Sequence, residues 1–314
     1  MSVNSTAPLH VEVLGSGPPL VLLHGWAMHG GVFAPLVERL RGRHTLHIVD
    51  LPGHGSSRDS SVPLTLDACV EVISRRVPRA PWCGWSLGGL IALQAAVTLP
   101  AQVPMLAMLC ASPRFVRGAD WKYGVSAEIF RDFATGLRSD YRRTLDRFVA
   151  LEAFGSEHAK DEIRALRNTL FARGEPAARV LADGLELLQT TDLRAMLPAL
   201  SVPSLWLGGR RDRLVDPRAM RAAAELTPNA EFHVIEHAGH APFLTHADAV
   251  TTRLAEFFGH HSREGGNSVT SALLPTTKAL DNSLRSPSGS SVSDDLRTAR
   301  LSRLRGNDEQ NDEP

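Results

Sequence analysis

A serine between two glycines is the strongest chemical signal in this chain. Residues 82–89 read Trp-Cys-Gly-Trp-Ser-Leu-Gly-Gly, which places Ser86 between Gly84 and Gly88. A nucleophile elbow needs this pattern, because its sharp strand-to-helix turn exposes the serine hydroxyl and leaves no room for a Cβ at the flanking glycines. A helix-forming run, residues 90–96, follows. The pattern predicts a nucleophilic serine, with an ordinary glycine-rich turn as the alternative.

An acid and a base stand at suitable places later in the chain. A serine hydroxyl needs a base to remove its proton, and the base needs an acid to orient it. In the elbow topology the acid and then the histidine follow the serine along the chain. Asp212 comes after an apolar run at residues 204–207, and His240 comes after one at residues 230–235. We therefore predict that three strand-end loops bring Ser86, Asp212 and His240 together.

Each of these two roles has a competitor in the sequence. Asp216 competes with Asp212, although Asp-Pro is a common helix start and Asp212 lies nearer to the end of its strand. His237 and His246 compete with His240, but the small residues beside His240 allow a tight loop that aims its ring at the serine. We therefore assign the acid to Asp212 and the base to His240.

Hydrolysis also needs hydrogen-bond donors for the tetrahedral oxyanion. One is expected from the backbone N–H of Leu87, directly after the serine, and the other from the loop at residues 24–26, most simply the N–H of Trp26. The alternative for Trp26 is a core aromatic side chain. His24 is expected to support this loop rather than to titrate.

No metal or nucleotide site is predicted, and serine hydrolysis requires no cofactor. The Gly-x-Gly-x-x-Gly and Gly-Lys-Ser/Thr phosphate patterns are absent. Four histidines in the first third of the chain lack the close, regular pairing of zinc ligands: His29, His44, His47 and His54.

The elements that must position these residues alternate between strands and helices. Apolar runs predict strands at 9–14 (an alternating, half-exposed edge), 19–23, 46–49, 80–85, 105–110, 202–209 and 230–235. Helical spacing appears at 32–40, 66–77, 220–226 and 247–258. Such alternation predicts an α/β fold with a mostly parallel sheet and flanking helices.

The middle and the end of the chain break this alternation. We predict a first part of the α/β core at residues 1–113, a helical lid at 114–190, a second part of the core at 191–260 and a disordered tail at 261–314. A short helix within the tail, at about residues 294–305, is a further possibility.

Bulk properties exclude several classes of function. Lys plus Arg equals Asp plus Glu at 34 each in 314 residues, so we expect no nucleic-acid or membrane partner. Three cysteines without a Cys-x-x-Cys pattern argue against a disulfide framework. There is neither a secretory signal pattern nor an apolar run of about 20 residues. We expect a monomeric, cytoplasmic protein.

Several motifs together resemble the α/β-hydrolase superfamily over about residues 8–259. They are HGWA at 24–27, DLPGHGSS at 50–57, GWSLGG at 84–89, an RRD turn at 210–212 and HAGHAPF at 237–243. Within the superfamily, the chain is most similar to the pimeloyl-[acyl-carrier-protein] methyl ester esterases of biotin synthesis. The tryptophans of HGWA and GWSLGGL, the stretch RFVALE at 147–152 and GSE at 155–157 carry this similarity.

The resemblance implies a fold with the Ser86, Asp212 and His240 roles given above, a substrate carbonyl near Trp26 and Leu87, and an acyl-carrier protein as partner. It places the acyl chain along Phe148, Val149, Ala150, Leu151 and Glu152. It places carrier docking on four basic residues of the lid: Arg143, Arg147, Lys160 and Arg164. Lys160 stands where the family pattern has Arg, Glu152 stands where it has Gln, and the tail has no counterpart.

The residues themselves leave the docking role open. Arg143 and Arg147 are four apart, as are Lys160 and Arg164, so each pair shares a helix face. Acidic residues are interleaved with them, and a solvated, salt-bridged face is the alternative. Other hypotheses for the whole protein are a general short-chain carboxylesterase, a carbon–carbon bond hydrolase, and, in another class, a ligand receptor without turnover.

Overall fold

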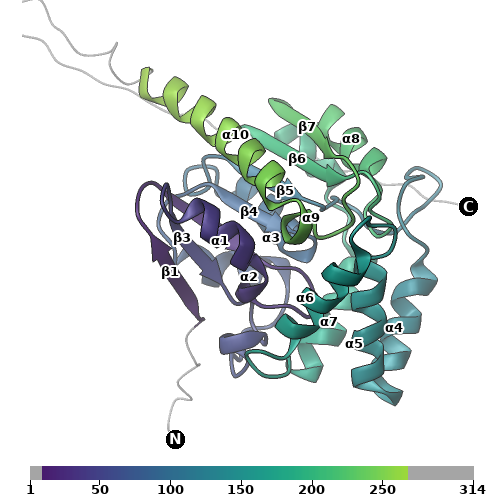
Figure 1. Ribbon diagram of the computed structural model, residues 1–314. Coiled ribbons are helices and arrows are strands. Elements are labelled where there is room, and N and C mark those ends of the chain that lie inside the picture. The colour runs from purple at the N-terminus through teal and green to yellow at the C-terminus, as the bar shows by residue number, and fades with distance from the viewer. Residues whose placement is uncertain (1–8, 268–314) are drawn as a thin grey trace, which may run out of the picture. The chain divides into compact units, whose positions relative to one another are not determined.

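One mixed sheet forms the centre of the protein (Figure 1). The computed structural model describes residues 9–267, with side-chain surroundings up to residue 261. Seven strands lie in the order β1-β3-β2-β4-β5-β6-β7, and only β1 runs antiparallel to its neighbour. They are β1 Val11–Gly15, β2 Pro19–Leu23, β3 Thr45–Val49, β4 Trp82–Trp85, β5 Leu106–Leu109, β6 Ser204–Gly209 and β7 Ala230–Ile235. The predicted α/β class with a mostly parallel sheet is confirmed, and β1 is the half-exposed edge.

Helices cover both faces of the sheet, which is why the central strands are apolar throughout. α1 (Ala34–Leu40) and α10 (Ala247–Asn267) lie together on one face, whereas α2 (Leu66–Ser74) and α3 (Leu87–Thr98) lie on the other (Figure 1). α8 (Pro217–Glu225) packs on β6 and β7. The short elements are α9 Pro242–Thr245 and the 3₁₀ turns Gly30–Phe33, Gly55–Ser57 and Arg194–Ala199.

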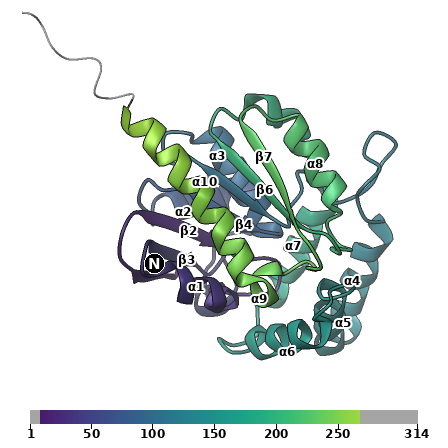
Figure 2. The same cartoon turned by 45° about the horizontal axis from the view of Figure 1, so that its top comes forward.

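Four amphipathic helices intervene between β5 and β6. They are α4 Ala127–Ser139, α5 Tyr141–Glu152, α6 Ala159–Leu170 and α7 Ala178–Thr190, called below the α4–α7 segment. Figures 1 and 2 show them gathered at one end of the sheet. Hydrogen bonds identify this end: Leu181 O accepts from the indole of Trp26 after β2, and Gly53 O after β3 accepts from Ala177 N. The segment therefore lies over the carboxyl ends of the strands, where ligands bind in α/β proteins.

The element boundaries differ from the sequence prediction in a few places. α10 runs to Asn267 rather than ending at residue 258, so the predicted start of the tail at 261 is wrong. The helical backbone continues there, and no proline interrupts the stretch. α8 begins at Pro217, earlier than the predicted residue 220, because Asp216 caps it. The helix suggested at residues 294–305 lies outside the described residues, and no described helix has the length and hydropathy to cross a bilayer.

Candidate active site

Ser86 occupies a strained turn between β4 and α3. Its φ of 53° and ψ of −118° lie outside the usual regions for a non-glycine residue. A Cβ on Gly84 would lie 2.3 Å from the carbonyl oxygen of Gly88, and one on Gly88 would lie 2.3 Å from that of Leu23. Both glycines are therefore required by close backbone approach, as the motif predicts. The geometry is that of a nucleophile elbow rather than of an ordinary turn.

The loop after β2 lies against this turn. A Cβ on Gly25 would lie only 3.2 Å from the Cβ of Ser86, so the backbone at Gly25 and Trp26 passes beside the serine. Within the described residues, the backbone N–H groups of Trp26 and Leu87 make no hydrogen bond. Two unengaged donors beside a serine are what an oxyanion needs.

The side chain of Trp26 also fits the alternative of a core aromatic. Its ring centroid lies 4.5 Å from that of Phe148 on α5, and its indole N–H donates to Leu181 O on α7 at 2.9 Å. The indole thus joins the loop to the α4–α7 segment while the backbone of the same residue faces Ser86. The two readings of Trp26 are compatible.

His24 supports this loop, as expected from the sequence. Its Nδ1 donates to Gly25 O at 2.8 Å, and its Nε2 accepts from Leu51 N at 2.9 Å. Burial, with a contribution from the neighbouring His54 ring, lowers the pKa of His24 to about 3. A neutral imidazole makes both bonds, so His24 acts as a fixed brace.

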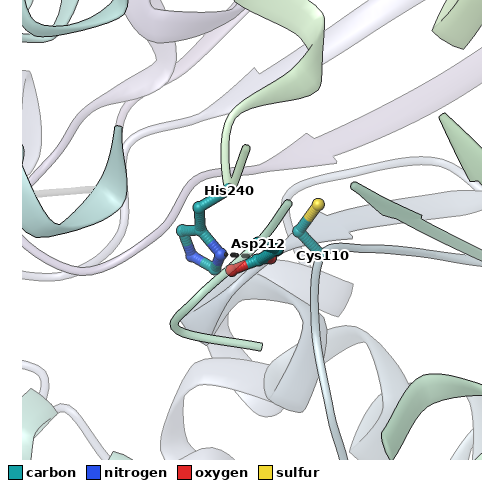
Figure 3. Close-up of side chains that lie close together, drawn as sticks. All are labelled: Cys110, Asp212 and His240. Carbon is teal, nitrogen blue, oxygen red and sulfur yellow. Dashed lines mark hydrogen bonds and ion pairs between the residues drawn. The ribbon is translucent and has the colours of Figure 1, made fainter. Parts of the chain in front are cut away.

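Asp212 and His240 form a buried pair. Figure 3 shows His240 Nδ1 directed at Asp212 Oδ2, and the hydrogen bond is 2.8 Å long. The other carboxylate oxygen, Oδ1, accepts from the backbone N–H groups of Leu214 and Val215, both at 2.8 Å. Three donors thus fix the carboxylate, and the carboxylate fixes the imidazole tautomer that leaves Nε2 able to accept a proton.

The other nitrogen of this imidazole has no partner. Nε2 of His240 is buried and makes no hydrogen bond within the described residues, and none is formed by the Ser86 hydroxyl. Trp85 nevertheless holds the two loops together, because its indole N–H donates to His240 O at 2.8 Å. In unliganded sites such serine–histidine bonds are often long and tighten only in complexes.

The competing acid and histidines lie elsewhere. Asp216 caps α8 by accepting from Arg218 N at 2.8 Å. His237 is exposed and pairs with Glu157 at 3.1 Å, and His246 contacts the hydroxyl of Thr245. The structure therefore brings Asp212 and His240 together, whereas Asp216, His237 and His246 are not part of this pair.

Cys110 lies beside this pair and was missed as a site residue by the sequence analysis. Its Sγ, an oxygen of Asp212 and a nitrogen of His240 lie within 4.8 Å of one another (Figure 3). Burial and the nearby Asp212 carboxylate raise the pKa of the Cys110 thiol well above its usual range. A metal ion does not fit between them, because Nδ1 and Oδ2 already bond to each other directly.

Glu152 is the most unusual charge-bearing group near the site. It is buried, and neither carboxyl oxygen has a hydrogen-bond partner within the described residues. Burial, together with the Asp212 and Glu162 carboxylates, raises the pKa of Glu152 well above its usual range. Burial at this position therefore favours the neutral carboxylic acid over the carboxylate.

The remaining residues assigned to the acyl chain divide into two groups. Phe148 and Val149 are buried, and Phe148 packs on Trp26 close to Ser86. Ala150 is exposed, and with Leu151 it lines a separate pocket of about 320 Å³ between α4 and α5. The structure does not bring Ala150 and Leu151 to the serine, because successive residues of a helix point in different directions.

The four basic residues lie on α5 and α6 and are exposed: Arg143, Arg147, Lys160 and Arg164. Arg164 pairs with Asp161 at 2.8 Å, and the guanidinium of Arg147 lies over the Phe133 ring at 5.7 Å. Arg143 and Lys160 have no carboxylate partner within the described residues. Within the described residues, three of the four (Arg143, Arg147 and Lys160) are thus free of the salt-bridged arrangement that was the alternative.

Comparison with known proteins places the chain in a family. A family model described as "alpha/beta hydrolase fold" matches residues 18–247. Among solved structures, the esterase EaEST from Exiguobacterium antarcticum has a TM-score of 0.71 at 23% identity, covering 79% of this chain and 94% of that one. The enol-lactonase from Burkholderia xenovorans LB400 has a TM-score of 0.70 at 22% identity, covering 80% and 96%. At these identities the structural likeness shows the fold alone.

Two curated relatives are far more similar in sequence. The pimeloyl-[acyl-carrier protein] methyl ester esterase of Xanthomonas oryzae pv. oryzae (strain MAFF 311018) is 59% identical over 249 residues, 79% of this chain and 98% of the relative. That of Stenotrophomonas maltophilia (strain R551-3) is 55% identical over 259 residues, 82% of this chain and 100% of the relative. The chain belongs to the alpha/beta hydrolase family and, within it, to the family of the pimeloyl-[acyl-carrier protein] methyl ester esterases.

Proposed function

We propose that the protein is a serine esterase that hydrolyses the methyl ester of pimeloyl-[acyl-carrier protein], releasing methanol and the free carrier-bound acid for biotin synthesis. The observation that carries this proposal is the buried Asp212–His240 pair, which is tied through Trp85 to the strained turn of Ser86. The 59% identity to a named esterase supports the choice of substrate.

In the first half of the reaction, Nε2 of His240 takes the proton of the Ser86 hydroxyl while the serine oxygen attacks the ester carbonyl carbon. The carbonyl oxygen gains the negative charge and accepts hydrogen bonds from the N–H groups of Trp26 and Leu87. The carbon–oxygen bond to the methoxy group then breaks. The leaving oxygen takes the proton from His240, methanol departs, and an acyl-serine remains.

In the second half, His240 removes a proton from water, and the resulting hydroxide attacks the acyl-serine carbonyl. The same two N–H groups hold the second oxyanion. The bond to the serine oxygen breaks, and His240 returns its proton to Ser86. The carboxylic acid that forms loses its proton to solvent and is released as the carboxylate. Throughout, Asp212 keeps Nδ1 protonated and stabilises the imidazolium that forms twice in each cycle.

The remaining parts of the proposal concern the substrate's carrier and the cell. The α4–α7 segment acts as the lid, Phe148 and Glu152 lie along the acyl path, and the exposed basic residues of α5 and α6 dock the acidic carrier protein. The enzyme acts as a cytoplasmic monomer without a cofactor. Its three cysteines are free and buried, which fits a reducing compartment.

The deciding experiment measures methanol from pimeloyl-carrier methyl ester with purified protein. Wild type should turn it over, Ser86→Ala should not, and Asp216→Asn, which alters only a helix cap and its ion pair with Arg218, should behave as wild type. Retained turnover by Ser86→Ala would refute the mechanism. Assays with p-nitrophenyl esters and a vinylogous diketone test the broader esterase and carbon–carbon hydrolase hypotheses, and a faster reaction with either would replace the proposed substrate.

A further inference from the structure

Within the α4–α7 segment, the residues that join α5 to α6, 152–157 (the lid segment below), contact the loop that carries His240. The backbone N–H of His240 donates to Glu152 O at 3.3 Å, and Glu157 N donates to His237 O at 3.2 Å. A Cβ on Gly239 would lie 3.0 Å from the Cβ of Ser156. The backbone at the base and just before it is thus held by residues of the segment that covers the site.

A buried carboxylate on α6 joins these contacts. Oε1 of Glu162 accepts from the Ser156 hydroxyl at 2.6 Å and from the Thr245 hydroxyl on α9 at 2.9 Å. Its other oxygen, Oε2, would lie 3.2 Å from a Cβ on Gly239. Glu162 therefore links α6, the lid segment before it and the helix directly after the His240 loop.

Burial of the Glu162 carboxyl group costs free energy, so filling space does not explain why this residue is here. Glu162 is buried, and Oε2 has no hydrogen-bond partner within the described residues. Burial raises the pKa of Glu162, and the two hydroxyl donors only partly oppose this effect. An apolar side chain of similar size would be better tolerated in such a place, so its polar contacts need another explanation.

We propose that Glu162 is a positioning residue that holds the His240 loop in register with Ser86 through the hydroxyl of Thr245. The inference rests on the proposed function, since it takes His240 to be the base. By this inference, the α4–α7 segment covers the site and also helps to align His240 with Ser86. The acceptor oxygen of Glu162 is the feature that matters, because both hydroxyl groups meet at that atom.

Steady-state kinetics on a small p-nitrophenyl ester test this without the carrier protein. Glu162→Ala should lower kcat at least about tenfold with little change in KM, since a misplacement of about 1 Å can cost about 100-fold in rate. Glu162→Gln keeps an acceptor oxygen for both hydroxyls and should keep kcat within about threefold of wild type. Asp161→Asn, the exposed neighbour on α6, is the matched control.

A second variant covers the case in which Glu162→Ala does not fold. Thr245→Val removes one donor without changing charge or size, and it should lower kcat about threefold or more. The low-field proton resonance of His240 Nδ1 should shift in Glu162→Ala and in Thr245→Val but not in Glu162→Gln. A kcat equal to that of wild type in Thr245→Val would overturn the inference.

Two other outcomes would also overturn it. One is wild-type kcat in Glu162→Ala with only a lower melting temperature, and the other is an equal loss in Glu162→Gln and Glu162→Ala. The titratable groups that interact with Glu162 are His240, His158, Glu152 and Cys110, so the pH profile of kcat is compared across Glu162→Ala, Glu162→Gln and Thr245→Val with these four groups unchanged. Labelling of Ser86 by a fluorophosphonate separates the two proposals: its absence in wild type removes the serine mechanism, whereas slower labelling in Glu162→Ala supports the positioning role.

Discussion

The indole N–H of Trp85 donates to the carbonyl oxygen of His240 across 2.8 Å, so the residue before the predicted nucleophile holds the predicted base. The Trp85 ring also packs on Phe243 with centroids 5.1 Å apart. The end of β4 and the loop after β7 are separated by two strands of the sheet. This single bond therefore joins two distant loops at the site.

Trp85→Phe should weaken catalysis because it removes this donor but keeps the ring. We expect kcat about tenfold lower and a free energy of unfolding lower by about 1–3 kcal/mol, the cost of an unpaired buried carbonyl. Trp82→Phe is the control, because the Trp82 indole N–H is buried and has no hydrogen-bond partner in the described part of the chain. Ester kinetics and urea unfolding measure both, and equal kcat in the two variants would contradict the prediction.

Asp212→Asn should lower kcat by about 10⁴-fold with little change in stability. The amide oxygen can still accept from Leu214 and Val215, so the NH₂ group faces His240 and stabilises the tautomer whose Nε2 carries a proton. Such an imidazole cannot take the proton of Ser86. Single-turnover kinetics check this, with Asp216→Asn as the control, since Asn caps helices as well as Asp.

Glu152→Gln should stabilise the protein at neutral pH. Because the folded-state pKa of Glu152 is raised above the ordinary value of 4.5, its stabilising contribution is full below that value and is lost as the pH rises toward the raised pKa. The neutral amide avoids this loss. The gain over wild type in urea unfolding should therefore grow from pH 5 upward.

The exposed Glu186 on α7 supplies the control for this pH series. The free energy of unfolding of Glu186→Gln should change with pH in the same way as that of wild type. A gain for Glu152→Gln that stayed constant from pH 4 to pH 8 would show that folding leaves the pKa of Glu152 unchanged, which would contradict the prediction.

Arg173→Met should loosen the attachment of the α4–α7 segment. Arg173 pairs with the buried Asp50 at 3.2 Å and with Glu12 on β1. The arginine is one-quarter exposed, so we expect a loss of about 2 kcal/mol in unfolding free energy, below the roughly 3–5 kcal/mol of a fully buried pair. Arg179→Met, which breaks an exposed pair with Asp183, should cost under about 0.5 kcal/mol.

Arg143→Glu and Lys160→Glu should each lower kcat/KM for the carrier-bound ester about tenfold at low salt, and the loss should shrink as salt is added. Hydrolysis of a small methyl ester should not change, since it does not involve the carrier. Arg76→Glu, after α2, is a charge-matched control. Equal effects of Arg76→Glu and Arg143→Glu would contradict docking on α5 and α6.

The sequence predicted those features that depend on residues close together in the chain. The close packing around Gly84 and Gly88 is visible in the motif itself, and apolar runs mark the strands that end at Asp212 and His240. Family resemblance, in contrast, placed all of residues 148–152 at the acyl chain. The direction of each side chain on α5 depends on how that helix packs, and the exposed Ala150 could not be told from the buried Phe148 by position alone.

Apart from the meeting of the loops that carry Asp212 and His240, contacts between distant segments could not be predicted. Cys110 carries no motif, and only the pairing of β5 with β6 places it beside Asp212. Glu162 reads in the sequence as one more acid on a charged helix, and its partner Thr245 is 83 residues away. The end of α10 was misplaced because the composition changes there while the backbone hydrogen bonding does not.

The predicted nucleophile, Ser86, is 1% exposed, and the His240 ring has no exposed surface. Because ester and water must both reach these atoms, we expect the helices of the α4–α7 segment to move away from the site and return in each turnover. Under saturating substrate, solvent viscosity should then slow the overall rate even though no covalent step depends on it. A shortened α4–α7 segment should raise the turnover rate and lower the selectivity for substrate. Many esters, and more water, would then enter the site.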